Sequence, residues 1–369
     1  MRRLSSQKPA LGRKLMAIKT AAEAIREALE QAMVGDERVL VIGEGVPDPK
    51  GIFGTTVGLR EKFGDKRVFD MPVSENGLTG VVIGAALSDL RPVLTHQRVD
   101  FALYSLDQII NNAAKWKFMF GQSVPVVIRM VIGRGWGQGA QHSQNLQALF
   151  AHIPGLQVVM PATAYDAKGL MMASIASDDP VVFLEHRWIH GLKGEVPTEE
   201  YAVPLGQANR VREGKDISVI ASSYMTIEAL RAVEVLEQAG VGVDLIDLRT
   251  IKPVDEKMIL ESVKKTGRLL VVDSGWATGG VAGEIMARVS EKVFDNLKQA
   301  PRRVTLPDSP APSSPALTKG FYKTWRDIAR VVGDMMKIKE SEMSRLIASE
   351  EKKITTPHDV PDASFTGPF

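Results

Sequence analysis

The feature that most constrains this chain is a regular alternation of helical and extended segments that begins near residue 18. Residues 20–33 carry apolar side chains at three- and four-residue spacing, and residues 38–43 form a short apolar run that ends in glycine. The first pattern is typical of an amphipathic helix, and the second is typical of a buried strand. The alternation continues to residue 185. It predicts a mainly parallel sheet covered by helices on both faces.

The alternation breaks once and then resumes. Residues 190–207 are rich in glycine, proline and charge, which indicates a linker. We therefore predict an α/β protein with two three-layer domains, the first over 18–195 and the second over 206–337, and 369 residues are enough for both. Residues 1–17 are expected to be a disordered start, and 338–369 a helix followed by a flexible tail.

Composition excludes several classes of function. The net charge is only +2, so no global field favours nucleic acid or an anionic membrane. Cysteine is absent, which excludes disulfides and thiolate metal sites and fits a reducing cytoplasm. No apolar run reaches the roughly 18 residues that a membrane-spanning helix needs. A basic, acid-free opening leaves an organellar matrix as the alternative location.

Two short stretches place chemically active side chains in unusual settings. In PVSENGLTG (72–80), Glu75 lies where a glycine-rich helical run begins, so we expect a carboxylate at a helix start. In GAQHSQN (139–145), His142 follows a glycine-rich loop that allows close approach of the backbone. A carboxylate and a histidine are suited to proton transfer near neutral pH.

Six segments of the chain form an ordered set of motifs. They are GEGV (43–46), residues 62–93, DQIINNAAK (107–115), GAQHSQ (139–144), residues 158–170 and residues 243–273. In order and spacing, these segments resemble the beta subunit of the thiamine-diphosphate-dependent component of 2-oxo acid dehydrogenase complexes, such as the pyruvate, branched-chain and acetoin dehydrogenase beta chains. The resemblance implies a transketolase-like, pyrimidine-binding domain followed by a transketolase C-terminal-like domain.

The resemblance implies a role for five residues. Glu75 would bind a pyrimidine ring nitrogen of thiamine diphosphate, and Phe101 would stack on that ring. The Val73 carbonyl and Glu44 would be further cofactor neighbours, and His142 would face the reacting carbonyl group. Each has an ordinary alternative, such as a helix-start glutamate, a loop acid, a core phenylalanine or a structural histidine.

What the sequence lacks implies a partner. The family binds the diphosphate through Mg²⁺ held by a Gly-Asp-Gly motif, and this chain has no such motif. The resemblance therefore implies an alpha subunit that completes each site in an alpha2beta2 heterotetramer, active only when assembled. It also implies a lipoyl acyltransferase as acyl acceptor. A potassium ion held by backbone carbonyls near Ser174, Ser177 and Asp179 is a further implication.

The substrate stays open. His96, Arg98, His186 and Arg187 lie near the expected site where relatives are commonly apolar, neutral or acidic, which hints at a more anionic 2-oxo acid than pyruvate. Equally, these side chains could face the partner subunit or solvent. Two other functions also remain, a split transketolase-like or carboligase subunit that needs no lipoyl partner, and a non-catalytic scaffold.

Overall fold

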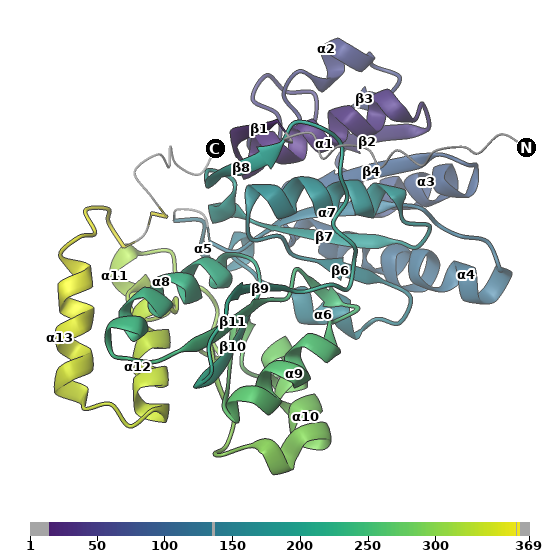
Figure 1. Ribbon diagram of the computed structural model, residues 1–369. Helices are drawn as coiled ribbons and strands as arrows, with labels where there is room; N and C mark the ends of the chain where they lie inside the picture. The colour runs from purple at the N-terminus through teal and green to yellow at the C-terminus, as the bar shows by residue number, and fades with distance from the viewer. Residues whose placement is uncertain (1–14, 135–136, 359, 362–369) are drawn as a thin grey trace, which may run out of the picture.

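Two sheets organise the chain (Figure 1). The computed structural model describes residues 15–134, 137–358, 360 and 361. The first sheet has seven strands in the order β12-β6-β7-β5-β4-β2-β3, and only β12 runs antiparallel to its neighbour. Its strands are β2 (Val39–Gly43), β3 (Val68–Phe69), β4 (Arg91–His96), β5 (Val127–Ile132), β6 (Gln157–Val159), β7 (Val181–His186) and β12 (Thr250–Lys252).

The second sheet has five strands in the order β14-β13-β10-β11-β9, all parallel except β9. These are β9 (Asn209–Arg212), β10 (Ile217–Ala221), β11 (Val243–Asp247), β13 (Leu269–Trp276) and β14 (Arg302–Leu306). The prediction of an α/β fold with two mainly parallel sheets is therefore confirmed.

Helices cover both faces of each sheet. Along β5, Val127 and Val131 join the core under α1 and α7, whereas Ile128 and Met130 join the opposite core. That opposite core continues from α3, α4 and α6 to α9 and α10 of the second domain, and α8, α12 and α13 cover the far face of the second sheet. The long helices are α1 (Ala21–Gly35), α3 (Glu75–Leu87), α7 (Ala164–Ala176), α8 (Tyr224–Gln238), α9 (Glu256–Thr266), α10 (Val281–Val293), α12 (Trp325–Met335) and α13 (Glu340–Glu351). The short ones are α2 (Leu59–Phe63), α4 (Ala114–Phe120), α5 (Gly139–His142), α6 (Gln147–His152) and α11 (Pro315–Thr318), with 3₁₀ turns at Arg187–Ile189 and Phe294–Asn296.

Two pairings between distant segments differ from the linear pattern. The expected linker contains β8 (Lys193–Pro197), which pairs antiparallel with β1 (Met16–Thr20). Strand β12 belongs to the second domain by sequence but pairs with β6 at the edge of the first sheet. The two domains are therefore joined by a shared sheet as well as by the shared core.

Three other stretches either differ from the predicted pattern or lie partly outside the described residues. Between β4 and β5 the chain forms a 3₁₀ turn (η1, Phe101–Ser105), a π-helical stretch (η2, Gln108–Ala113) and then α4 in place of one regular helix. Residues 16 and 17 of the expected disordered start already belong to β1, and residues 1–14 lie outside the described part of the chain. The helix expected in the last segment is α13, and residues 359 and 362–369 of the expected tail are not described. Within the described ranges, no helix has the length and apolar character needed to cross a membrane.

Candidate functional site

The topology brings the predicted site residues to one edge of the first sheet. Strands β5, β4, β2 and β3 are parallel neighbours, so their carboxyl ends share an edge. Each of these strands leads to a predicted site residue, and ligand sites of open parallel sheets form at such an edge. Glu44 follows β2, Glu75 follows β3, Phe101 follows β4 and His142 follows β5.

Two glutamates form the acidic part of the site. Glu75 is the first residue of α3 and is 8% exposed, which confirms the prediction of a carboxylate at a helix start. Burial raises the pKa of Glu44, and the nearby carboxylates of Glu75 and Asp70 raise it further. The Oε1 atom of Glu44 is buried and has no hydrogen-bond partner in the described part of the chain. This orphaned acceptor fits a ligand that donates a hydrogen bond.

His142 and Phe101 form the second part of the site. Their ring centroids lie 5.4 Å apart. His142 Nδ1 lies 2.7 Å from Oδ2 of Asp100, and the His142 side chain remains 41% exposed. If Nδ1 donates its proton to Asp100, the Nε2 atom is left as a hydrogen-bond acceptor. Asp100 is thus placed to orient the histidine and to favour the tautomer with the proton on Nδ1.

Asp100 is a site residue that the sequence did not single out. The only available signal was its position immediately before Phe101. Its contact with His142 depends on where α5 lies against the loop after β4, which no local pattern reveals. Val73, by contrast, was predicted and lies two residues before Glu75 with its side chain 83% exposed, so only its backbone is suited to a specific contact.

The basic residues near the site are buried in the protein interior. His96, Arg98, His186 and Arg187 are 3 to 7% exposed, so they do not face bulk solvent. Burial lowers the pKa of His186 to about 3, and its ring stacks on Tyr224 with centroids 4.9 Å apart. These positions do not support the hint of a more anionic substrate.

Two of these basic side chains have clear packing roles. Arg98 donates to the Gly133 carbonyl oxygen at 3.1 Å and to the side chain of Gln138, so it holds the loop that leads to His142. Arg187 lies over the Phe53 ring, 4.3 Å from its centroid. Both residues therefore shape the surroundings of the site from inside the protein.

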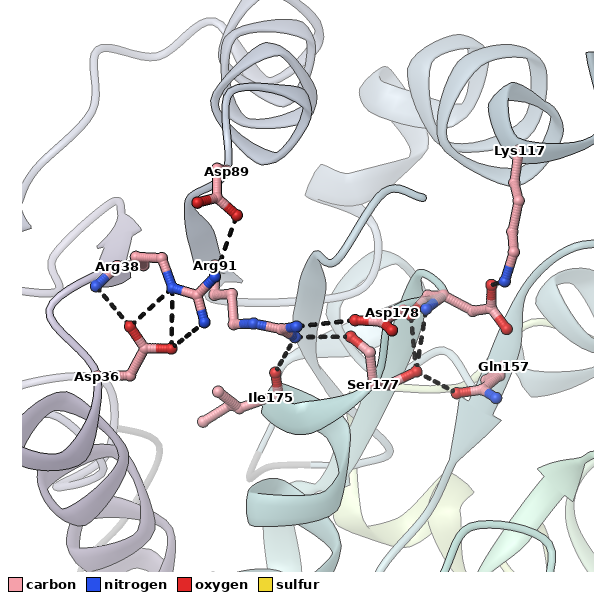
Figure 2. Close-up of polar contacts among 10 residues, drawn as sticks. Asp36, Arg38, Asp89, Arg91, Lys117, Gln157, Ile175, Ser177 and Asp178 are labelled. Atoms are coloured by element: carbon pink, nitrogen blue, oxygen red, sulfur yellow. Dashed lines mark hydrogen bonds and ion pairs between the residues drawn. The ribbon is translucent and has the colours of Figure 1, made fainter. Parts of the chain in front are cut away.

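The carbonyls expected to bind potassium already have donors from the protein (Figure 2). Arg91 Nη1 donates to the carbonyl oxygens of Ile175, at 3.0 Å, and Ser177, at 3.1 Å. The Ser174 carbonyl accepts from the Ser177 backbone amide at 3.2 Å, and the Asp179 carbonyl accepts from the Ser177 hydroxyl at 3.1 Å. A guanidinium ion this close would repel a metal cation. The residues at the end of α7 thus do not fit the predicted potassium site.

Two domain models match this chain. The model described as "Transketolase, pyrimidine binding domain" matches residues 18–189, and the model described as "Transketolase, C-terminal domain" matches residues 206–328. A solved structure titled "Split gene transketolase, inactive beta4 tetramer" is 24% identical, with a TM-score of 0.71 over 87% of this chain and 99% of that one. That likeness concerns the fold.

Three similar curated proteins are beta subunits. The acetoin:2,6-dichlorophenolindophenol oxidoreductase subunit beta of Cupriavidus necator is 43% identical over 85% of this chain and 96% of its own length. The pyruvate dehydrogenase E1 component subunit beta of Rickettsia felis is 40% identical over 85% and 97%. The 2-oxoisovalerate dehydrogenase subunit beta of Bacillus subtilis is 41% identical over 83% and 95%.

Proposed function

Because this chain belongs to the family of beta subunits of thiamine-diphosphate-dependent 2-oxo acid and acetoin dehydrogenases, we propose that it supplies the pyrimidine-binding half of an active site shared with an alpha subunit. The observation that carries this proposal is the buried, unpartnered Oε1 atom of Glu44 beside the carboxylate of Glu75. Two acidic groups in one partly buried site favour a ligand with hydrogen-bond donors, as an aminopyrimidine has.

Each residue of this half-site would hold a different part of the cofactor. Glu75 would hydrogen-bond a pyrimidine ring nitrogen, the Val73 carbonyl would accept from the amino group, and Phe101 would stack on the ring. Glu44 would stabilise the same end of the ring. The bound cofactor supplies a thiazolium carbon that adds to the substrate carbonyl group.

His142 would move the proton of the reacting oxygen. Asp100 Oδ2 lies 2.7 Å from Nδ1, so the Nε2 atom of this partly exposed side chain would be free to accept a proton from that oxygen or return one to it. With the tautomer fixed, Nε2 would begin every turnover without a proton and ready to accept one.

The other half of the site would come from the partner. The chain has no Gly-Asp-Gly motif, so the Mg²⁺ that binds the diphosphate would take its ligands from an alpha subunit. Relatives named as beta subunits imply such a partner. We propose an alpha2beta2 assembly that decarboxylates a small 2-oxo acid and passes the acyl group to the lipoyl arm of an acyltransferase.

Substrate choice is the finer part of the proposal. The similar beta subunits carry the names of pyruvate, 2-oxoisovalerate and acetoin enzymes at 40 to 43% identity, so they do not favour one of these. The test is to co-express the chain with an alpha subunit that carries Gly-Asp-Gly, add thiamine diphosphate and Mg²⁺, and assay each substrate with 2,6-dichlorophenolindophenol as electron acceptor.

Reduction of the dye with one of the three substrates is the expected result, and Glu75→Gln should lower it at least about 100-fold. Glu61→Gln on α2 is the matched control, because Glu61 is exposed and is none of the predicted site residues. Activity that survives in Glu75→Gln would contradict the assignment of the half-site. Ketol transfer in place of dye reduction would favour a carboligase or transketolase-like subunit.

A further inference from the structure

The chain continues after the part that the domain models match. The C-terminal model ends at residue 328, and α13 and the residues after it lie outside both models. We call residues 352–358 the strap. In Figure 1 the yellow end of the chain leaves α13 and turns back over α11. The strap thus runs from the far side of the second domain toward the site.

The strap starts from a firmly packed helix. Met343 and Ile347 of α13 are 1% and 2% exposed and belong to the core of the second domain. A Cβ atom added to Gly333 of α12 would lie 2.8 Å from Met343 Cε, so the two helices are in close contact there. Glu351, the last residue of α13, pairs with Arg326 of α12. The helix from which the strap starts is therefore fixed by packing against α12.

The strap ends on Arg134, eight residues before His142 in the chain. Arg134 Nη2 donates to the His358 carbonyl oxygen at 2.9 Å. The guanidinium group lies between two aromatic rings, 3.6 Å from the centroid of Trp188 and 4.3 Å from that of Tyr322. Arg134 is 9% exposed, so the strap carbonyl completes the surroundings of a largely buried cation.

The strap also contacts the segment that packs against α5. The His358 Nε2 atom lies 3.1 Å from the Pro315 carbonyl oxygen at the start of α11. A Cβ atom on Gly139, the first residue of α5, would lie 2.7 Å from the Ser313 hydroxyl oxygen. Tyr322, whose ring centroid lies 4.3 Å from the Arg134 guanidinium group, is close to Ser143, the residue after His142.

We propose that the strap is a positioning element for His142. The strap binds Arg134, which precedes α5 in the chain. Through its contact with α11 it also supports the loop at Ser313 that packs against Gly139 of α5. The strap touches none of the proposed reacting groups, so it would act through the orientation of His142. Its effect on the segment 137–144 needs no cofactor, whereas its effect on turnover rests on the proposed function.

Two truncations test the strap in the full assembly. One ends the chain after Glu351, which removes the strap and keeps α13, and the matched control ends it after Pro361. We expect the shorter chain to show at least about tenfold faster backbone hydrogen exchange over residues 137–144, because the hydrogen bond to a charged group is lost. Exchange in β5 should not change.

A second pair of variants distinguishes loss of the strap contact from a general folding defect of the truncated chain. Arg134→Lys keeps the charge but loses the planar group between the rings, and should also speed exchange over residues 137–144. Arg345→Lys, at an exposed position of α13, is the control and should not. Unchanged exchange in both the truncated chain and Arg134→Lys would overturn the proposal.

Turnover is the second readout. In the assembly with an alpha subunit, removal of the strap should lower kcat about tenfold or more and leave KM nearly unchanged, because His142 orientation matters mainly in the reaction step. Faster exchange without any activity in the intact enzyme would support the strap as a structural clamp and contradict the proposed function. Faster exchange with an unchanged kcat would overturn the catalytic role of the strap.

Discussion

At the level of single side chains, Asp100 is the residue whose role most depends on geometry. Its Oδ2 atom lies 2.7 Å from His142 Nδ1, and an asparagine there could present an N–H group to the same atom. That change would favour the wrong tautomer, as loss of an orienting carboxylate does elsewhere. We expect Asp100→Asn to lower kcat about 10- to 100-fold in the assembly, with little change in melting temperature.

Asp107→Asn provides the control for Asp100→Asn, because Asp107 is exposed and, in the described part of the chain, its carboxylate accepts hydrogen bonds from the side chains of Gln108 and Asn111. The pH dependence of kcat adds a readout that a purely structural role would not change. Equal kcat and equal pH profiles for Asp100→Asn and the unaltered chain would refute the role of Asp100.

Glu44 makes the stability of the isolated chain depend on pH. Its pKa is raised by burial, then by Glu75 and Asp70, so the folded state disfavours its ionised form. A carboxyl group whose pKa is higher in the folded state loses stability as pH rises from its unfolded value through its folded value. We expect Glu44→Gln to melt at a higher temperature than the unaltered chain near pH 8 and to approach it near about pH 4.

Thermal melting of the cofactor-free chain across that pH range measures the difference between Glu44→Gln and the unaltered protein. Glu61→Gln, at an exposed position, should show no such trend. A difference in melting temperature that stays constant with pH would mean that the folded state does not raise the pKa of Glu44.

The residues found from sequence are those that local motifs identify. Glu75 was placed at a helix start because a proline-led extended stretch meets a glycine-rich helical run, and the structure begins α3 there. The sequence did not identify the roles of Asp100 and Arg91, because these roles depend on tertiary contacts. The carbonyls that Arg91 binds lie more than 80 positions away in the chain.

Among the elements, the carboxyl end of α7 has a protein cation beside the carbonyl oxygens for which the sequence resemblance implies a potassium ion. Arg91 is 18% exposed in its side chain and binds two carbonyl oxygens and Asp178 (Figure 2). We expect the melting temperature of the assembly to be the same in KCl and NaCl at equal ionic strength. Arg91→Ala should destabilise the chain by about 1 to 3 kcal/mol, because the carbonyls lose a charged donor.

Chemical denaturation of Arg91→Ala and of the control Arg38→Ala measures this effect. Arg38 lies beside Arg91 in Figure 2 but pairs with exposed Asp89 and with Asp36, so its loss should cost less. A clear, saturable stabilisation of the unaltered assembly by potassium would restore the potassium site.

Helices and strands with strong local patterns agreed with the structure, whereas elements defined by long-range pairing did not. Helix α7 (Ala164–Ala176) falls within the alternation that the sequence predicts up to residue 185, and its start carries a clear local signal in the Thr163 cap. Strand β12 was not expected, since three residues take a strand conformation only when β6 lies beside them. The π-helical stretch η2 likewise has the composition of an ordinary helix.

For the whole molecule, the join between the two domains has the strongest energetic consequence. Arg249, next to β12, reaches Asp166 of α7 with 2.7 Å between Nη2 and Oδ1, and Asp166 is 2% exposed in its side chain. The backbone carbonyl of Arg249 also accepts a hydrogen bond from the Met160 amide at 2.8 Å. Burial raises the pKa of Asp247 nearby, and the Asp166 carboxylate raises it further. Arg249 therefore offsets the charge of a buried acidic pair at the domain contact.

Removal of that guanidinium leaves Asp166 buried without its cation, which costs about 3 kcal/mol or more. We expect Arg249→Ala to lower the melting temperature and to separate the unfolding of the two domains, so that the van't Hoff enthalpy falls below the calorimetric enthalpy. Arg249→Lys, which keeps the charge, should recover part of the loss. A single transition at the original temperature in Arg249→Ala would mean that β12 and the shared apolar core hold the domains together without the ion pair.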